Sequence, residues 1–257
     1  MISKAKFNFI KALHQKKSRQ KEGLFLVEGA KMINELLTSD FEIVQMLLTA
    51  ETVENYSSRN SNVFKNLVID IIDEDQLSKI SSLQNVSAGI AIVKIKQQKL
   101  NTLQIADLAK ENLILLLDHI QDPGNLGTII RIADWFGIKN IVCSTDTVDF
   151  YNSKTIQSTM GSIFRVEVSY ADLEDLLETS PRSIPVFGAL LDGKSIYGHP
   201  LSKNGFIVLG NESRGINSLL LPYISYKIKI PSFGNAESLN VGIAAGIICS
   251  EFKSRYV

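Results

Sequence analysis

The sequence GNESRG at residues 210–215 decides how the rest of this chain is interpreted. It directly follows the apolar run FIVL at 206–209, which predicts a buried strand that ends in a glycine-flanked loop. A second polar turn, IPSFG at 230–234, precedes the segment SLN at 238–240, where a helix is expected to begin. Two such turns, each loaded with polar side chains and each at the end of an apolar strand, indicate a ligand-binding site.

A third element of the same kind lies upstream, at residues 118–131 (DHIQDPGNLGTIIR). It follows the apolar run LILLL at 113–117, so it is also expected to leave the end of a buried strand. Pro123 suits a turn or the first position of a helix, and the glycines allow the backbone to approach a ligand closely. We expect the helix that starts here to carry Arg131.

Apolar runs alternate with helical patterns through the second half of the chain, at 113–117, 138–143, 185–191 and 206–209. This alternation is typical of a mostly parallel β-sheet with helices on both faces. The predicted fold class is therefore α/β.

The first part of the chain predicts a smaller α/β unit. The expected helices are 4–15, 30–37 and 74–80, the expected strands are 24–27, 43–48 and 90–95, and 16–23 is expected to be a polar loop. A length of 257 residues favours two domains. We place a first domain at 1–97, a linker at 98–111 where the sequence turns polar and irregular, and a second domain at 112–257.

The overall charge does not indicate a polyanionic partner, since 27 basic and 27 acidic residues cancel. The first 31 residues are different, because they hold eight Lys or Arg against two Glu. A local basic cluster can bind phosphates, although a solvated lysine-rich helix face is the simpler interpretation of charge alone. The candidate RNA-binding residues in this cluster are Lys16, Lys17, Arg19 and Lys21.

The two cysteines, Cys143 and Cys249, each lie inside an apolar stretch and show no metal-binding or disulfide spacing. They are expected to behave as small core residues, and no metal site is predicted. No apolar run approaches the roughly 20 residues that a membrane span needs, and the N-terminus lacks an apolar signal region. We therefore expect a cytoplasmic protein that does not bind membranes.

Taken together, the three polar elements resemble the three signature motifs of the SpoU (TrmH-type) RNA ribose methyltransferases of the SPOUT superfamily. They occur in the family's order, and the resemblance is strong over 112–255 and looser over 1–96. The segment 25–31 is also similar to the start of the L30e-like substrate-binding domain that precedes many SpoU domains. The residues that carry the main resemblance are Asp122, Pro123, Gly124, Asn125, Leu126, Gly127 and Arg131 in the first motif, Gly210, Asn211, Glu212 and Gly215 in the second, and Ile230, Pro231, Ser238, Leu239, Asn240 and Val241 in the third.

The resemblance implies transfer of a methyl group from S-adenosylmethionine to a ribose 2′-hydroxyl of RNA. It also implies a C-terminal trefoil knot, which is rare among folds, and a homodimer whose sites form where two catalytic domains meet. The implied catalytic residues are Asn125, Arg131, Glu212, Ser238 and Asn240, and the implied cofactor-binding residues are Leu209, Gly210, Ile230 and Leu239. From its own position, Ser238 is also a plausible N-cap for a helix over 238–252.

The chemistry of the reaction defines what these residues must do. The sulfonium donor is already activated, so alignment of the hydroxyl with the methyl group supplies much of the rate enhancement. The hydroxyl is a weak acid, so a base or a strong stabilising charge is needed as the methyl group arrives. Arginine is a poor base because its guanidinium is always protonated. Two roles therefore stay open for Arg131: a base once desolvated, or a cation that clamps phosphate and lowers the pKa of the hydroxyl.

The individual residues also have simpler interpretations. Arg131 alone would suggest a surface salt bridge, and Glu212 a carboxylate at a helix N-terminus. The chain departs from the family at Gly242, where a serine is usual, and His119 occupies a variable position that we interpret as structural.

Two other functions are compatible with an α/β chain of this kind. A nicotinamide or flavin enzyme is a rival for an α/β chain with glycine-rich turns, but the GxGxxG fingerprint is absent from the sequence. An RNA-binding protein that keeps the fold without methyl transfer is the second rival. The sequence does not identify the RNA: 23S rRNA and tRNA are both candidates, and the additional N-terminal domain favours rRNA.

Overall fold

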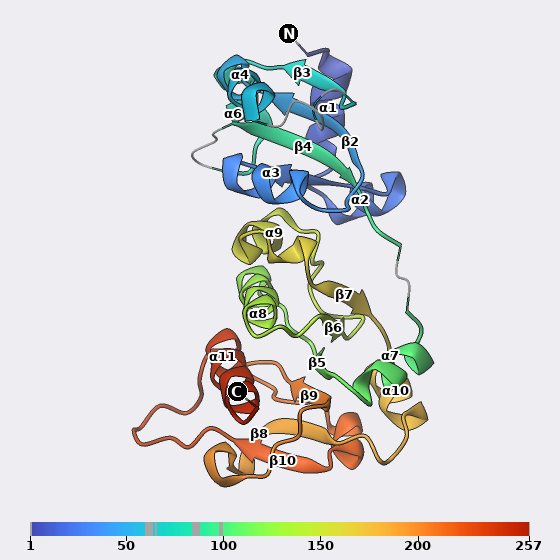
Figure 1. Cartoon of the computed structure of the whole chain (residues 1–257), viewed down its shortest axis with the longest axis vertical. Helices are drawn as coiled ribbons and strands as arrows, with labels where there is room; N and C mark the ends of the chain where they lie inside the picture. The colour runs from blue at the N-terminus through green and yellow to red at the C-terminus, as the bar shows by residue number, and fades with distance from the viewer. Residues whose placement is uncertain (1, 60–63, 65, 84–87, 98–99, 257) are drawn as a thin grey trace. The chain divides into compact units, whose positions relative to one another are not determined.

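The computed structural model describes residues 2–59, 64, 66–83, 88–97 and 100–256. The chain divides into two compact units (Figure 1). The first unit consists of Met1–Gln97 and Tyr151–Phe164, and the second of Gln98–Phe150 and Arg165–Val257. Each unit has its own β-sheet and its own hydrophobic core.

The first unit contains a four-stranded sheet in the order β1-β4-β2-β3. Strand β4 runs antiparallel to β1 and β2, and β2 runs parallel to β3. The strands are β1 Leu24–Glu28, β2 Ile43–Leu48, β3 Ile69–Ile71 and β4 Gly89–Lys94. The helices are α1 Lys4–Ala12, α2 Lys16–Glu22, α3 Ala30–Leu37, α4 Ala50–Arg59, α6 Glu74–Ile80 and α9 Ser153–Thr159, with a 3-10 turn η1 Ser162–Phe164.

The segment 151–164 lies between two strands of the second unit in sequence but packs on strand β1 of the first. The Tyr151 ring lies against the Phe25 ring, with centroids 4.4 Å apart. The Gln157 side-chain nitrogen donates a 2.8 Å hydrogen bond to the Glu28 carbonyl. The sequence did not predict this arrangement, because a crossover helix normally covers its own sheet.

Residues 16–23, expected as a polar loop, form helix α2 and its cap. Lys, Arg, Gln and Glu are all good helix formers, so the segment needs no apolar stripe to be helical. Gly23 ends the helix in the left-handed conformation at φ +65°, and its N–H donates to the Arg19 carbonyl. The loop prediction was wrong because it relied on hydrophobic periodicity.

Arg19 is buried, with only 2% of its surface exposed. Its guanidinium donates to the carbonyl oxygens of Leu13 at 3.0 Å and His14 at 2.7 Å, where α1 ends. This burial contradicts the expectation that Arg19 contacts RNA, because its donors already satisfy carbonyl groups of the α1–α2 turn.

The second unit is built on a six-stranded sheet in the order β10-β8-β9-β5-β6-β7, in which every neighbouring pair is parallel. This confirms the predicted parallel α/β fold. The strands are β5 Leu113–Leu117, β6 Asn140–Cys143, β7 Glu167–Tyr170, β8 Val186–Ser195, β9 Gly205–Leu209 and β10 Tyr226–Lys229.

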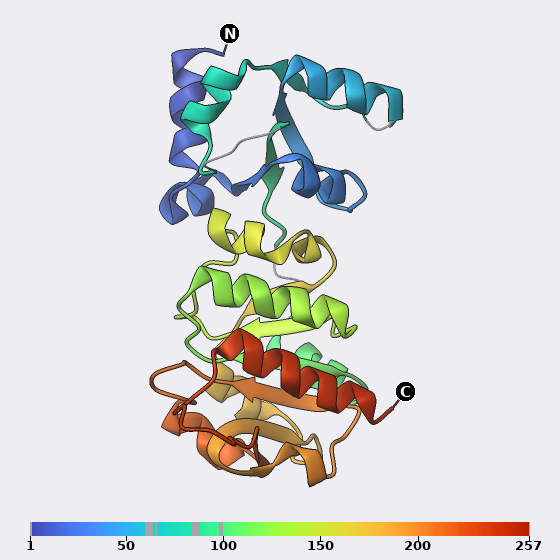
Figure 2. The ribbon, with the colours of Figure 1, turned by 90° about the vertical axis from the view of Figure 1, so that its left-hand side faces the viewer.

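Helices cover both faces of this sheet, as predicted. Figures 1 and 2 show α8 and α11 side by side on one face, while α7 and α10 lie on the other. The helices are α7 Thr102–Ala109, α8 Pro123–Trp135, α10 Leu173–Thr179 and α11 Val241–Ser254, with 3-10 turns η2 Ile196–Gly198 and η3 Ser218–Tyr223.

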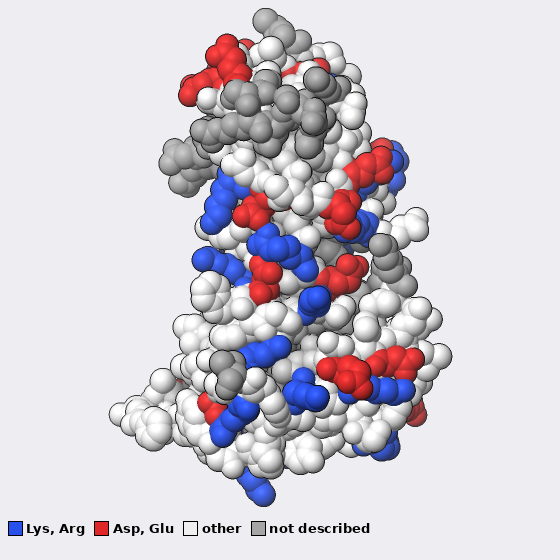
Figure 3. Space-filling view, in the orientation of Figure 1, with Lys and Arg blue, Asp and Glu red and all other residues white. Residues whose placement is uncertain are grey.

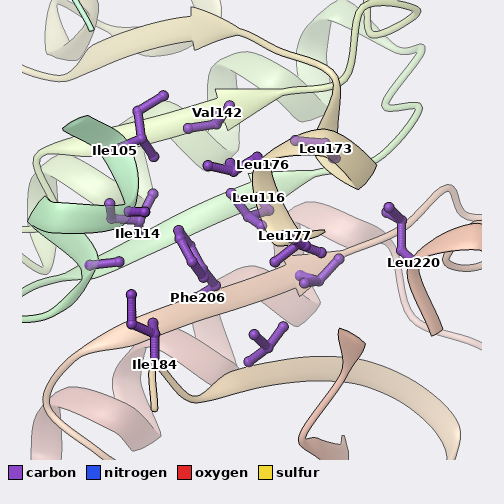
Figure 4. Packing of buried hydrophobic residues seen from close by; sticks show 14 of the residues in the cluster. Ile105, Ile114, Leu116, Val142, Leu173, Leu176, Leu177, Ile184, Phe206 and Leu220 are labelled. Atoms are coloured by element: carbon purple, nitrogen blue, oxygen red, sulfur yellow. The ribbon is translucent and has the colours of Figure 1, made fainter. Parts of the chain in front are cut away.

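The central strand β5 is buried along its whole length, because helices cover both of its faces. On the α7–α10 side, Ile114 and Leu116 pack with Phe206 of β9 and Leu176 of α10 (Figure 4). Because both faces of β5 are apolar and buried, polar side chains can follow it only in the loop after its last residue. Functional residues associated with β5 are therefore expected in that loop.

The predicted linker 98–111 contains helix α7, and its residues 98 and 99 lie outside the described residues. Asn101 and Gln104 form a reciprocal capping box, with bonds of 2.9 and 3.0 Å between each side chain and the other's backbone N–H. Ile105 and Ala109 are buried in the core of the second unit. The linker expectation was wrong here because the polar start of this segment is a helix cap.

Helix α11 begins at Val241, three residues later than expected, and its N-cap is Asn240 instead of Ser238. The Asn240 side-chain oxygen accepts hydrogen bonds from the N–H groups of Gly242 at 2.9 Å and Ile243 at 3.3 Å. Asparagine is at least as good an N-cap as serine. The trefoil knot concerns how this segment threads through the chain, and it stays a prediction.

Candidate active site

Three loops meet at the carboxyl edge of the parallel sheet. They follow β5, β9 and β10, and β5 and β9 are neighbours in the sheet. The backbone N–H of Asp118 donates to the Leu209 carbonyl at 2.9 Å, which joins the first residue beyond β5 to the last residue of β9. Ligands of open parallel sheets bind at this edge.

The loop after β9 is held by its own backbone. Asn211 and Gly215 exchange two hydrogen bonds of 3.0 and 2.9 Å. A Cβ atom on Gly210 would lie 2.3 Å from the carbonyl carbon of Gly215, closer than atoms can approach. Gly210 is therefore required by the loop itself, in addition to any approach of a ligand.

A hydrogen-bonded network links the three sequence motifs through their side chains. The Asn125 amide nitrogen donates to the Glu212 carboxylate at 2.5 Å. The Asn240 amide nitrogen donates to the Asn125 side-chain oxygen at 2.9 Å. These two hydrogen bonds join one residue from each motif. We refer to Asn125, Glu212 and Asn240 as the tri-motif network.

Local sequence places Asn125 at the start of helix α8. Asp122 is the N-cap, and its side chain accepts from the Asn125 N–H at 2.9 Å, while Pro123 occupies the first turn. The Thr128 hydroxyl donates to the Gly124 carbonyl at 2.8 Å. The DPGN sequence thus builds a helix N-terminus that presents Asn125 to the loop after β9.

A cavity of about 700 Å³ opens beside the tri-motif network. This volume is in the range of small-molecule sites, and the backbone at Gly210 leaves no room for a side chain. All four predicted cofactor-binding residues line it, together with two of the predicted catalytic residues. These lining residues are Leu209, Gly210, Ile230, Leu239, Glu212 and Ser238.

Sequence reasoning missed a fourth segment of the cavity wall, residues 189–192 of β8. The pairing of β8 with β10 jumps from Gly188↔Lys227 to Lys194↔Ile228, so the residues between bulge out of the ladder. A Cβ on Gly193 would lie 2.6 Å from the Ile228 carbonyl carbon. Gly193, a glycine within the segment that forms β8, is the sequence signal for this bulge.

Arg131, unlike the other predicted catalytic residues, neither lines the cavity nor belongs to the tri-motif network. It is exposed on α8 and is not among the lining residues. Within the described part of the chain, no hydrogen bond or ion pair engages its guanidinium. The nearby Arg165, by contrast, pairs with Asp134 at 2.8 Å.

His119 connects the loop after β5 to its neighbours. It adopts φ +57°, unusual for a residue with a side chain. Its N–H donates to the Ser144 hydroxyl at 2.8 Å, its carbonyl accepts from the Asn211 amide at 3.0 Å, and its ring nitrogen lies 2.5 Å from Asp146. These contacts agree with the structural role expected for His119.

Two acidic residues at this edge have shifted pKa values. Burial raises the pKa of Asp118, although its hydrogen bond from the Asn217 N–H at 2.6 Å acts in the opposite direction. Burial would also raise the pKa of Asp146, but hydrogen bonds from Ser144 and His119, together with the charge of His119, bring it below its usual value. Asp118 accepts a hydrogen bond from the backbone of the segment after β9, and Asp146 is bonded to Ser144 and His119.

Neither a metal-binding cluster nor a membrane-spanning helix occurs among the described residues. Among them, no group of three or more His, Cys, Asp or Glu side chains is arranged to hold a metal ion. None of the helices in the described ranges combines the length and apolar character needed to cross a membrane. Burial raises the pKa of the Cys249 thiol to about 12, so it stays protonated in the core.

Comparison with known protein families now identifies the second unit. Residues 112–250 match the model of the SpoU rRNA methylase family, and residues 4–91 match an MRM3-like substrate-binding domain. The chain belongs to the SpoU rRNA methylase family. The family model spans the three loops and the tri-motif network, so the matched region contains the whole cavity edge.

Individual relatives resemble the chain over its full length. The 23S rRNA (guanosine(2553)-2′-O)-methyltransferase RlmP of Bacillus subtilis is 32% identical and covers 93% of this chain and 92% of its own. A TrmH-family RNA methyltransferase of Porphyromonas gingivalis superposes with a TM-score of 0.83 at 32% identity, covering 99% of each chain. The AdoMet-bound rRNA methyltransferase of Sinorhizobium meliloti gives 0.86 at 27% identity, covering 100% of this chain and 97% of its own.

These findings confirm the predicted family, fold class and activity. The chain is an RNA 2′-O-ribose methyltransferase of the SpoU type, and its cofactor is S-adenosylmethionine. The geometry adds that Asn125 and Asn240 lie outside the cavity wall and are joined to its lining residue Glu212 by hydrogen bonds.

Proposed function

We propose that this methyltransferase modifies a ribose of large-subunit ribosomal RNA, with tRNA as the second candidate. Relatives from Bacillus subtilis and Neisseria meningitidis are named for 23S rRNA guanosines, and one from Streptomyces viridochromogenes is named for a 23S rRNA uridine. The substrate-binding domain matched at 4–91 favours a large, structured RNA. The relatives differ in the base that they select, so the base itself is a matter for experiment.

The cavity residues hold the cofactor at the carboxyl edge of the sheet. Leu209, Gly210, Ile230 and Leu239 surround the space through backbone and apolar contacts. When bound, S-adenosylmethionine supplies an electrophilic methyl group on a sulfonium. The tri-motif network keeps the three loops in place, so that the hydroxyl is aligned without reorganisation during the reaction.

The exposure of Arg131 favours its role as a phosphate clamp over a role as a base. Its guanidinium is exposed and engages none of the described residues, so its donors are available to RNA. Guanidinium stays protonated in proteins and binds phosphate through two parallel hydrogen bonds. In this role Arg131 holds the phosphate beside the target ribose and lowers the pKa of the 2′-hydroxyl, while the proton leaves to water or to the phosphate.

The proposal includes a homodimer formed through α8 and α11. Trp135 of α8 is 84% exposed and Ile243 of α11 is 57% exposed, although the two helices pack against each other. Large apolar side chains on one helix pair are typical of a protein interface. Arg131 lies one helical turn before Trp135, so a second copy on this face would place Arg131 at the junction of two catalytic units.

The first unit supplies the RNA-binding lysines. Lys16 and Lys17 are exposed at the start of α2, whereas Lys21 also forms a 3.3 Å ion pair with Glu22. Lys and Arg side chains are interspersed with acidic ones on the face in Figure 3, so RNA is held by local clusters and not by a uniformly positive surface. A cytoplasmic location follows from the proposed ribosomal substrate.

Mapping of ribose methylation in total RNA, from cells with and without this gene, tests the proposal. The expected result is the loss of one 2′-O-methyl group from large-subunit rRNA. Loss of a tRNA methyl group would select the second candidate. Unchanged methylation of all RNA, together with retained RNA binding in vitro, would support the alternative of an RNA-binding protein without transferase activity.

A further inference from the structure

The segment between β10 and α11 carries an aromatic side chain that the fold does not use. Figure 1 shows this segment as a loop that extends away from the sheet. Phe233 lies in the loop with 95% of its surface exposed, the largest exposed fraction among the large apolar residues described. It also lines the mouth of the cofactor cavity, together with Ser232.

The loop holds Phe233 out by its local geometry. The Ser232 hydroxyl donates to the Gly234 carbonyl at 3.1 Å, which forms a tight turn with Phe233 at its centre. No ring stacking or cation contact links Phe233 to another residue in the described part of the chain. The ring is therefore available to another molecule, and its burial against a partner would be favourable.

We propose that Phe233 stacks on the base of the nucleotide to be methylated, or on its immediate neighbour. This inference rests on the proposed function, because it takes RNA ribose as the acceptor. The 2′-hydroxyl must reach the methyl group inside the cavity, and the base is attached to the same sugar. Sequence-specific RNA recognition relies on unstacked bases, which stack on aromatic side chains. The mouth of the cavity is therefore where a base needs a partner, and Phe233 is there.

The residues around Phe233 favour a base over a phosphate or a second protein. Residues 232–240 are all exposed, and their only charged residue is Glu237, so the loop offers no cation for phosphate. Phe233 is flanked by Ser232, Gly234 and Asn235, so it is not part of a continuous apolar patch. The core of a protein interface requires such a patch, whereas one base needs only one aromatic face.

The test compares four variants: Phe233→Ala, Phe233→Leu, Phe233→Tyr and Phe233→Trp. KM for a large-subunit rRNA transcript is measured at saturating S-adenosylmethionine, and Kd for the cofactor is measured separately. The alanine and leucine variants are expected to raise the RNA KM by between about fivefold and 150-fold, the range for one base–aromatic stack. The tyrosine and tryptophan variants are expected to stay within about threefold of the wild type, because they keep the aromatic face.

A matched control is Leu219→Ala, which removes an exposed apolar side chain of the same unit outside the cavity. It is expected to change neither constant. An unchanged RNA KM in Phe233→Ala would overturn the proposal, and so would full activity in Phe233→Leu or a change confined to cofactor Kd. A loss of dimer mass in Phe233→Ala would identify a protein contact instead. A wild-type protein that methylates no RNA would refute the proposed function itself, and the inference with it.

Discussion

The carboxyl edge of the parallel sheet and helix α2 of the first unit both carry polar residues, but they use them differently. At the sheet edge, the side chains of Asn125, Glu212 and Asn240 bond to one another. On α2, Lys16 and Lys17 are exposed and face solvent. The first group is committed to holding loops in place, and the second is available to a partner. Substitutions in the tri-motif network should therefore affect stability and cofactor binding, whereas substitutions of Lys16 and Lys17 should affect RNA binding.

Arg131 combines features of both regions. It belongs to one of the three motifs at the sheet edge, yet its side chain is exposed, like those of Lys16 and Lys17 on α2. A residue in this position contributes little to the folded chain, and under the proposed function it acts only when RNA and a second subunit are present. We therefore predict that substitution of Arg131 greatly lowers the methyl-transfer rate and has little effect on folding or cofactor binding.

The largest expected effect is that of Arg131→Ala. Loss of ~3–4 kcal/mol of transition-state stabilisation lowers the single-turnover rate by roughly two to three decades. Arg131→Lys should also be severely impaired, because an ammonium group cannot bind phosphate through a planar fork. Cofactor Kd, measured by calorimetry, should stay within about twofold of the wild type. A single-turnover rate equal to that of the wild type would exclude Arg131 from the reaction.

The next effect concerns the tri-motif network. Asn125→Ala removes both hydrogen bonds of the network, each worth ~0.5–1.5 kcal/mol because Glu212 is only half-buried and Asn240 is exposed. We expect cofactor affinity to fall about tenfold or more, with a lower Tm. The double variant with Asn240→Ala should lose less than the sum of the two single variants, because both single variants remove the same Asn125–Asn240 hydrogen bond. Strict additivity would show that the network does not couple the motifs.

A smaller effect is expected on α2. Lys16→Ala and Lys17→Ala should weaken RNA binding and reduce the slope of log Kd against log salt by about one per lysine. The value of kcat at saturating RNA should be unchanged. Lys21→Ala is a matched control with a weaker expected effect, because Lys21 pairs with Glu22. A salt slope unaffected by all three substitutions would remove α2 from the RNA-binding surface.

The smallest effect is expected for Asp146→Asn beside His119. The folded-state pKa of Asp146 is lowered, so its ionised form stabilises the fold above its unfolded pKa, and this contribution is lost as pH falls through the folded pKa. The variant should have a slightly lower Tm at neutral pH, and the difference from the wild type should vanish in acid. Because Asp146 is largely exposed, the change is small. A Tm difference that grew in acid would contradict this sign.

Much of the second unit could be predicted from the sequence because helices cover both faces of its sheet. Strands such as 113–117 and 206–209 are then continuous apolar runs, and the polar residues that follow them fall at one edge. Helix α2 could not be found in this way, since it has no apolar stripe and buries only Arg19. Helix α7 begins with a polar cap, which resembles a linker when hydrophobicity alone is considered.

The candidate site shows the same limit. The residue types of the three motifs indicated a ligand site, and the family resemblance assigned their roles. The contact between Asn125 and Glu212 spans 87 positions, and residue spacing does not show which loops meet. The cavity wall at 189–192 depends on a β-bulge, and the packing of 151–164 on β1 depends on tertiary contacts. These features are decided by long-range packing.

We propose that this chain methylates a ribose 2′-hydroxyl of large-subunit rRNA. The most direct measurement incubates the purified protein with methyl-labelled S-adenosylmethionine and an rRNA transcript, followed by alkaline hydrolysis of the RNA. A 2′-O-methyl group blocks cleavage at its own position, because alkaline cleavage needs the free 2′-hydroxyl. We predict label in one alkali-resistant dinucleotide, formed roughly two to three decades more slowly with Arg131→Ala. Label released entirely as mononucleotides, or no label from a folded, cofactor-bound protein, would contradict this prediction.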